Sequence, residues 1–480
     1  MLFNSLEYLV FLPAVVCLHF LIPQRFRWVL LLVASYAFYM AWKVEYALLI
    51  LTSTVVDYVA ALAMGRCEEK RDRRKWLWLS LATNLGLLFT FKYANFASDS
   101  LRVLGERMNV SADFPTLELL LPVGISFYTF QTLSYTIDVY RGHQQPERHF
   151  GRFAVFVAFF PQLVAGPIER AARLLPQFQE RHRFHWQQFK GGLQLILWGF
   201  FKKLVIADQA AIYVEKVYGD PGGHEGLSLL VAGYLFAFQL YCDFSGYSDI
   251  AVGSARLMGF RLMENFRAPY LAPNVREFWR RWHISLSTWF RDYVYVPLGG
   301  NRGTTGRWAA AIAAVFVTSG LWHGANWTFF VWGALHAVYM LTGAATAGIR
   351  DRWAERLPGW LRRPRLVVGA LVTFHLWTFS LVFFRSASVG EAFSYLDGLW
   401  SRMAWSKPAI RLDMSWKEFF AITLPIVALM ALEIWRGRRT WLEFLERRSA
   451  PFRLVLYLAL FFSILVLSPL GSQEFIYFQF

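Results

Sequence analysis

Apolar runs long enough to cross a lipid bilayer recur along almost the whole chain, and this feature limits the possible folds most strongly. A membrane-spanning helix needs about 20 mostly apolar residues, and it satisfies its own backbone hydrogen bonds inside the bilayer. We therefore predict an all-α polytopic membrane protein with about 12 transmembrane helices. These are expected at residues 6–22, 27–42, 45–64, 76–93, 118–139, 190–213, 227–245, 307–322, 325–347, 366–386, 416–434 and 453–469.

The composition agrees with a membrane protein. Apolar residues make up 56% of the 480 residues and charged residues only 17%, whereas soluble domains average about 45–50% and about 25%. Tryptophan and tyrosine, which collect at membrane–water interfaces, number 21 each. No spacer rich in Ser, Gly or Pro divides the chain, and no internal repeat is visible. We predict one membrane domain over residues 1–480.

The net charge of +16 sets the expected orientation in the membrane. Arg and Lys lie in short loops and form no single basic face, so they do not indicate nucleic-acid binding. About 36 of them fall in one alternating set of loops and about 7 in the other, and basic loops stay in the cytoplasm. We predict a multi-pass membrane protein, surrounded by lipid, with both termini outside the cytoplasm. The basic loops are 23–27, 65–75, 140–190, 246–306, 348–365 and 435–453.

The cysteines and the first apolar run bear on two further classes of protein. Cys17, Cys67 and Cys242 lie far apart, so we expect no disulfide framework and no metal site. The first run lacks the basic flank and small-residue cleavage site of a signal peptide. We expect it to be retained as the first span.

Residues 152–168 are apolar but too short for an ordinary span. They contain Pro161 and Pro167, which interrupt helices. We predict a re-entrant or half-spanning segment, which is tolerated at membrane depth only where protein or water covers the irregular backbone.

The segment 274–290 predicts an amphipathic helix. Asn274 and Glu277 have the spacing of a capping box, in which each side chain binds a backbone N–H at the helix start. Arginines then alternate with tryptophans, which suits the lipid headgroup region or a shallow pocket. A plain surface helix is the alternative. The residues concerned are Trp279, Arg280, Arg281, Trp282 and Trp289.

His323 is the strongest candidate for chemistry. It lies in the segment GLWHGANW between two apolar runs, and ionisable groups within spans are costly and usually functional. Trp322 offers a flat wall, Asn326 offers a polar group, and the two glycines allow close approach of a backbone or ligand. A buried histidine with a purely structural role is the alternative.

Other polar residues are weaker candidates. His336 follows thirteen residues later, about three and a half helical turns, so we expect it to lie far from His323 and to be structural. His375 is ambiguous, and so is His283 on the predicted amphipathic helix. Asp243 and Asp249 end a predicted span, where aspartate favours caps and turns.

Several segments resemble the membrane-bound O-acyltransferase family, most closely its bacterial polysaccharide branch, which includes the alginate O-acetylation proteins. They span about residues 120–340 in the order of the family, and extra helices expected at 387–480 also fit that branch. The similar segments are LPVGISFYTFQTLSYTIDVYRG (121–142), FFPQLVAGPIER (159–170), YCDFSGYSDIAVGSARLMGF (241–260), FRAPYLAPNVREFWRRWHISLSTWFRDYVYVPLGG (266–300), LWHGANWTFFVWGALHA (321–337) and the tail FIYFQF (475–480).

The resemblance implies a fold and a reaction. It implies a ring of helices, thinned at its centre, with His323 as the catalytic residue and His283 as the second functional histidine. Members of this branch take an acyl group from a cytoplasmic thioester and pass it across the membrane. The expected donor is acetyl-CoA, and no bound cofactor is expected. A separate extracytoplasmic acetyltransferase commonly completes the transfer to the polysaccharide.

The chemistry agrees with this assignment. A hydroxyl is a weak nucleophile and needs a base within hydrogen-bond reach, and histidine titrates near neutral pH. We predict that His323 is the general base and that His283 positions the donor or the acceptor. The predicted substrate-binding residues are Trp322, Asn326, Trp282, Arg281 and Trp279.

Two alternatives stay open. The same chemistry would serve D-alanyl transfer to teichoic acid, or O-acetylation of peptidoglycan or cellulose. A transporter or flippase without chemistry belongs to a different class. Transporters often have inverted repeats and charged residues within spans, and the sequence shows neither a repeat nor a span interior rich in charge.

Overall fold

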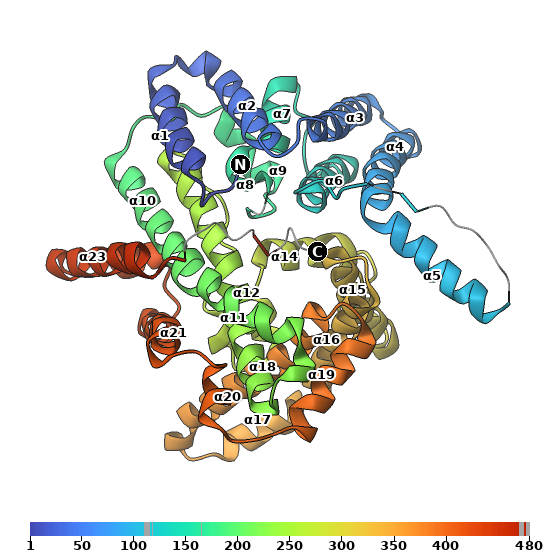
Figure 1. Cartoon of the computed structure of the whole chain (residues 1–480). Helices are drawn as coiled ribbons and strands as arrows, with labels where there is room; N and C mark the ends of the chain where they lie inside the picture. The colour runs from blue at the N-terminus through green and yellow to red at the C-terminus, as the bar shows by residue number, and fades with distance from the viewer. Residues whose placement is uncertain (110–115, 118, 165, 470–474, 477–480) are drawn as a thin grey trace. The chain divides into compact units, whose positions relative to one another are not determined.

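The computed structural model describes residues 1–109, 116, 117, 119–164, 166–469, 475 and 476 (Figure 1). Within these residues the regular secondary structure is helical, and they form no β-strand. The predicted all-α class is confirmed. The chain divides into two compact units, which we call unit 1 (Met1–Leu193 with Ala251–Met263) and unit 2 (Gln194–Ile250 with Glu264–Phe480).

Unit 1 contains the N-terminal helices, drawn in blue to teal in Figure 1. Helices α3, α4 and α6 pack against one another, and α7 packs against α2 and α3. The elements are α1 (Leu6–Leu21), α2 (Gln24–Met40), α3 (Tyr46–Arg66), α4 (Lys70–Leu88), η1 (Phe89–Tyr93), α5 (Ala94–Arg107), α6 (Ile125–Arg141), α7 (Phe150–Ala158), α8 (Phe160–Leu163), α9 (Ala171–Leu174) and η2 (Pro176–Phe178). Helix α10 (Trp186–Phe200) begins in this unit.

Unit 2 contains most of the later helices. Helix α12 (Gly226–Leu257) belongs to unit 2 up to Ile250. The other elements are η3 (Phe201–Ala207), α11 (Asp208–Gly219), η4 (Pro221–Gly223), η5 (Pro269–Leu271), α13 (Val275–Trp279), α14 (Ile284–Phe290), η6 (Arg291–Tyr295), α15 (Thr305–His323), α16 (Trp327–Ala345), α17 (Ala347–Arg356), η7 (Gly359–Leu361), α18 (Arg362–Arg385), α19 (Val389–Ser401), α20 (Lys407–Arg411), α21 (Trp416–Arg436), α22 (Trp441–Glu446) and α23 (Ala450–Leu467).

The predicted spans coincide with helices. Among the described residues, six helices are long and apolar enough to cross a membrane: α3, α12, α16, η7 with α18, α21 and α23. Helix α1 is apolar but shorter. The span predicted at 118–139 becomes helical only at Ile125, because Gly124 has φ +77° and precedes the first helical residue. The number of 12 spans and their arrangement in a ring stay predictions.

The segment predicted to be re-entrant is a broken helix. Helix α7 ends at Ala158, and α8 starts at Phe160 with Pro161 in its first turn. Both pieces are almost entirely buried, so protein covers the interrupted backbone as this type of segment requires. The interruption is confirmed, and its depth in the membrane stays a prediction.

A polar cluster lies between α3, α4 and α6 in unit 1. Asp57 of α3 is fully buried. Its carboxylate accepts hydrogen bonds from Ser80 Oγ (2.6 Å) and from Asn84 Nδ2 (2.9 and 3.0 Å), both on α4. Ser80 Oγ also lies 3.0 Å from Thr136 Oγ1 of α6. Neutral side chains therefore join three predicted spans around one carboxylate.

Candidate functional site

The hairpin of α15 and α16 positions His323. Helix α15 ends at His323, and α16 begins four residues later at Trp327. The two helices pack backbone against backbone, since a Cβ atom at Gly320 would lie 2.2 Å from Phe329 O and one at Gly333 would lie 2.4 Å from Phe316 O. The predicted close approach at Gly320 is thus an approach of backbones, and it fixes the end of α15 on α16.

Aromatic side chains surround the His323 ring. The imidazole is 4% exposed. Its centroid lies 5.2 Å from Trp332 of α16 and 5.4 Å from Phe384 of α18, both in edge-to-face geometry. This shell shields the ring from bulk water and gives it apolar surroundings.

His283 lies at a break between two short helices, which shows that the continuous amphipathic helix predicted for residues 274–290 is wrong. Helix α13 ends at Trp279 and α14 begins at Ile284, and His283 between them has φ +43°. Asn265 supplies the missing partners: its carbonyl accepts the Ile284 N–H (3.0 Å), and its Oδ1 accepts the Ser285 N–H (3.2 Å). A distant residue therefore stabilises the break.

The start of α13 bears out half of the predicted capping box. Asn274 Oδ1 accepts the Glu277 N–H at 2.9 Å. The Glu277 carboxylate pairs with Arg280 (2.7 Å) and lies 3.7 Å from Arg281. The plain surface helix is wrong for this segment, because its large apolar side chains are buried. These are Phe278, Trp282, Leu286, Trp289 and Phe290.

Trp322 contacts both candidate catalytic histidines. Its ring centroid is 6.0 Å from that of His283 and 5.0 Å from that of His323. Burial lowers the pKa of His283 to about 3, so this imidazole is neutral at physiological pH. Tertiary folding thus brings together three side chains that the sequence singled out, although the α13–α14 segment and the α15–α16 hairpin are distinct elements.

Three other predicted substrate-binding residues, Trp282, Trp279 and Arg281, differ in their burial and in their neighbours. Trp282 is buried in an aromatic cluster that includes Trp377 at 4.6 Å. Trp279 faces Trp332 at 5.9 Å. Arg281 keeps 18% of its side chain exposed beside Glu277. Substrate contact by any of them stays a prediction.

Asn326 has a clear structural role at the start of α16. Its Oδ1 accepts the Thr328 N–H (3.0 Å), and its Nδ2 donates to Ala387 O (2.8 Å) beyond α18. One carboxamide therefore caps α16 and holds the chain that leaves α18. Its predicted contact with substrate is an additional role that stays a prediction.

His336 is buried and has a hydrogen-bond partner on α18. Its structural role stays a prediction. Its Nε2 lies 3.0 Å from Ser380 Oγ. The argument that it lies far from His323 along one axis fails, because the helix is interrupted between them. Trp332 contacts both rings, at 4.7 Å from His336 and 5.2 Å from His323. The exposed His375 bonds to Tyr234 Oη (2.9 Å).

Two lysines that sequence reasoning missed neutralise the aspartates of α12. Asp243 and Asp249 do not form a cap or turn, because α12 continues to Leu257. Lys203 Nζ lies 2.7 Å from Asp243, and Lys202 Nζ lies 2.7 Å from Asp249. Two consecutive lysines inside the predicted span 190–213 could have indicated buried carboxylate partners on another helix. That span interior does carry charge, contrary to expectation, and carboxylates balance it.

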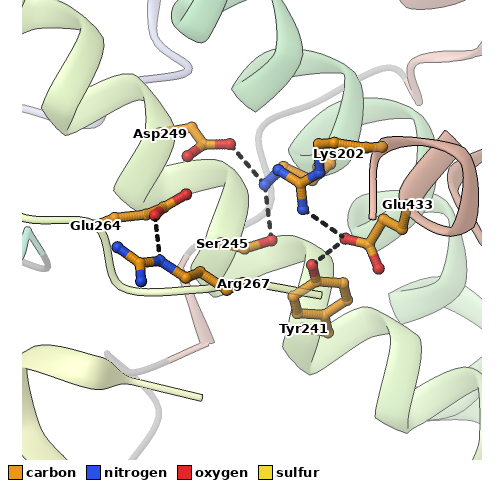
Figure 2. Close-up of polar contacts among 8 residues, drawn as sticks. Lys202, Tyr241, Ser245, Asp249, Glu264, Arg267 and Glu433 are labelled. Carbon is orange, nitrogen blue, oxygen red and sulfur yellow. Dashed lines mark hydrogen bonds and ion pairs between the residues drawn. The ribbon is translucent and has the colours of Figure 1, made fainter. Parts of the chain in front are cut away.

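Figure 2 shows the surroundings of Lys202 in unit 2. The ammonium bonds to Ser245 Oγ (2.9 Å) and pairs with Asp249. Nearby, Tyr241 Oη donates to Glu433 on α21. Three helical segments, η3, α12 and α21, thus meet through charged and polar side chains.

Within the described part of the chain, no group of three or more His, Cys, Asp or Glu side chains is arranged to hold a metal ion.

Comparison with known proteins decides the family. Residues 148–388, which include His283 and His323, match the pattern described as MBOAT, membrane-bound O-acyltransferase family. The probable alginate O-acetylase of Azotobacter vinelandii is 41% identical over 409 residues, covering 85% of this chain and 79% of that protein. The chain belongs to the membrane-bound O-acyltransferase family. It is therefore a multi-pass membrane enzyme that transfers acyl groups to oxygen.

Two further relatives place this O-acyltransferase among bacterial proteins of the family. The probable alginate O-acetylase of Pseudomonas aeruginosa is 40% identical over 410 residues, covering 84% of this chain and 76% of that protein. The peptidoglycan O-acetyltransferase of Helicobacter pylori is 34% identical over 395 residues, covering 77% and 73%. The resemblance stated from the motifs is confirmed.

Proposed function

We propose that this O-acyltransferase moves an acetyl group from a cytoplasmic thioester, acetyl-CoA, across the inner membrane for O-acetylation of an exopolysaccharide, with His323 as the general base. The observation that carries the proposal is that two buried histidines both make ring contacts with Trp322. Alginate is the first candidate polymer, because relatives named as alginate O-acetylases match most of the chain.

The reaction needs one proton to be removed and returned. As the acceptor oxygen attacks the thioester carbonyl, its proton passes to the neutral His323 ring. The C–S bond then breaks, and the protonated imidazole returns the proton to the leaving thiolate, so the base is regenerated. The aromatic shell of His323 excludes the water that would otherwise hydrolyse the donor.

His283 has a positioning role in this scheme. Its neutral imidazole contacts Trp322, which also contacts His323. In this position the His283 ring orients the donor or the acceptor by a hydrogen bond. The Trp322 ring forms a flat wall of the site. The substrate contacts assigned to Trp282, Arg281, Trp279 and Asn326 belong to this proposal.

The proposal includes a path across the membrane. The enzyme lies in the bacterial inner membrane with both termini outside the cytoplasm and forms a single domain. The basic loops face the cytoplasm, where acetyl-CoA is available, and the acceptor lies on the opposite side. A separate extracytoplasmic acetyltransferase completes the transfer to the polymer.

The test is polymer-bound ester in a deletion strain complemented with wild type or with His323→Ala. Ester should be released by base and the acid identified by mass spectrometry. Acetate with wild type and none with the variant, at equal expression, supports the proposal, and the polymer that carries it names the substrate. Near-normal acetate with His323→Ala excludes this base.

The same measurement separates the alternatives. Acetate on peptidoglycan would favour the activity named for the Helicobacter pylori relative, and acetate on cellulose would favour that polymer. Released D-alanine would favour transfer to teichoic acid, a system that also needs a dedicated carrier protein and ligase. Ester that is unchanged in the deletion strain would favour a transporter.

A further inference from the structure

Two consecutive lysines at the start of η3 are both buried and both reach carboxylates on α12. Lys203 Nζ lies 2.7 Å from Asp243 Oδ1 and 2.8 Å from Asp208 Oδ1, and all three side chains are at most 4% exposed. Burying an ion pair costs desolvation energy, so its geometry has to be good and further hydrogen bonds have to satisfy the remaining atoms. The second oxygen of the Asp243 carboxylate therefore also needs a hydrogen-bond donor.

That oxygen binds the backbone of Ile476. Asp243 Oδ2 accepts the backbone N–H of Ile476 at 2.7 Å. The preceding Phe475 stacks on Tyr247, with centroids 4.5 Å apart, and also contacts Phe244 at 5.8 Å. Phe475 and Ile476 are 1% and 2% exposed. One ion-paired carboxylate thus holds Ile476 against α12.

The same aromatic group touches the candidate site. The ring of Phe244 meets that of His283 edge-on at 4.6 Å. Phe244 thus contacts both Phe475 and His283. His283 occupies the break between α13 and α14, so its orientation depends on packing as well as on the backbone contacts from Asn265.

We propose that Lys203 and Asp243 are positioning residues of the acyl-transfer site: they hold Phe475 and Ile476 against α12 and thereby set the aromatic wall on which His283 rests. Lys203 orients the Asp243 carboxylate, and the carboxylate captures the Ile476 N–H. The inference rests on the proposed function in one respect, that His283 belongs to the acyl-transfer site.

Lys202 provides a matched control one residue away. It is buried to the same degree as Lys203, with 4% of its side chain exposed. Figure 2 shows that its ammonium reaches Ser245 and Asp249 further along α12. Lys202→Met therefore removes a buried lysine from the same turn but leaves the Asp243–Ile476 contact in place.

The first experiment compares Lys203→Met, Lys203→Arg and Lys202→Met in membranes that contain the full-length protein. Thiol release from acetyl-CoA gives kcat and KM, and polymer-bound acetate gives the yield per folded molecule. Misplaced catalytic groups cost roughly 10- to 100-fold in rate, so we expect kcat of Lys203→Met to fall at least tenfold with KM little changed. Lys203→Arg should recover part of the loss, and Lys202→Met should stay within about threefold of wild type.

A second pair of variants leaves the buried helices intact. Ile476→Pro removes the N–H that Asp243 binds, whereas Ile476→Ala keeps it. We expect a roughly tenfold lower kcat for Ile476→Pro and a smaller effect for Ile476→Ala. If Lys203→Met does not fold, the comparison of Ile476→Pro with Ile476→Ala tests the inference instead. Wild-type kcat in Ile476→Pro, or an equal loss in Lys202→Met, overturns the inference.

Hydrogen exchange separates the failure of this inference from the failure of the proposed function. The C-terminal peptide should exchange faster in Asp243→Asn than in Lys202→Met, whether or not the protein acetylates a polymer. Unchanged protection in Asp243→Asn contradicts the positioning role. Absence of thiol release and of polymer acetate with wild type contradicts the proposed function alone.

Discussion

The two units bury carboxylates in opposite ways. In unit 1, Asp57 receives hydrogen bonds from the hydroxyl and amide groups of α4. In unit 2, Asp243 and Asp208 share the ammonium of Lys203, and Asp249 pairs with Lys202. Both solutions avoid an unpaired charge in an apolar environment, which is the costly case.

The two kinds of carboxylate partner, neutral side chains in unit 1 and lysines in unit 2, indicate different roles for the two clusters. Hydrogen bonds between membrane helices contribute about 1 kcal/mol or less each, so the Asp57 cluster serves to join α3, α4 and α6. In unit 2 the carboxylates Asp243 and Asp249, which pair with the two lysines, lie on α12. The same helix carries Phe244, which contacts His283. We therefore expect changes at Asp57 to affect stability, and changes around the histidines to affect catalysis.

The largest effect is expected for His323→Ala in unit 2. Loss of a general base lowers rates by roughly 10²- to 10⁴-fold, so polymer-bound acetate should disappear at normal expression. His336→Gln is the control, since it alters another buried histidine that bonds to Ser380, and it should retain activity within about threefold. Equal losses in both variants would contradict the division between catalytic and structural histidines.

The next effect tests unit 1. Asp57→Ala leaves the Ser80 and Asn84 donors without their acceptor, which should lower the free energy of unfolding by about 2–3 kcal/mol. Acetate per folded molecule should change less than twofold. Asp57→Asn keeps the shape and should cost less. If Asp57→Asn folds normally but abolishes acetylation, unit 1 carries chemistry and the comparison fails.

A pH-dependent effect of similar size is expected from His283. Its pKa is about 3 in the folded protein and near 6.5 in an unfolded chain. Between these values the unfolded state binds the extra proton, so the free energy of unfolding falls as the pH falls below about 6.5, by roughly 2 kcal/mol at pH 5. Thermal unfolding at pH 5 and pH 7.5 should show a larger loss in wild type than in His283→Gln. Identical losses in both proteins would show that His283 does not contribute.

The smallest effect is expected for Asn326→Ala. Loss of the cap on Thr328 and of the bond to Ala387 should cost about 1–2 kcal/mol of stability. Asn326→Asp retains the cap and should recover part of that loss. A tenfold fall in acetate for Asn326→Ala at unchanged stability would instead support the predicted substrate contact.

Local sequence was sufficient for the helices and for the candidate histidines. Apolar runs predicted helices such as α3 and α16 close to their observed bounds, because the length and composition of a run decide whether it can span a bilayer. His323 stood out because an ionisable residue between two apolar runs is rare. His283 depended on the family resemblance, since its own surroundings resembled a surface helix.

Local sequence was insufficient where distant residues satisfy the backbone or the charge. The helix predicted through residues 274–290 breaks because Asn265 binds the N–H groups of Ile284 and Ser285. Asp243 suggested a turn because serine and glycine follow it, yet Lys203 pairs with it within a continuous helix. Neither partner is close in sequence, so no local pattern indicated them.

The sequence alone therefore determined that this protein is a helical membrane protein, and it identified His323 and Trp322 as the centre of a candidate site. These properties follow from hydrophobic length and from adjacent residues. Only the tertiary structure decided that His283 faces Trp322, that Lys203 holds Asp243, and that Ile476 binds to α12. Each of these depends on which distant group satisfies a buried polar atom, and that partner is chosen by packing.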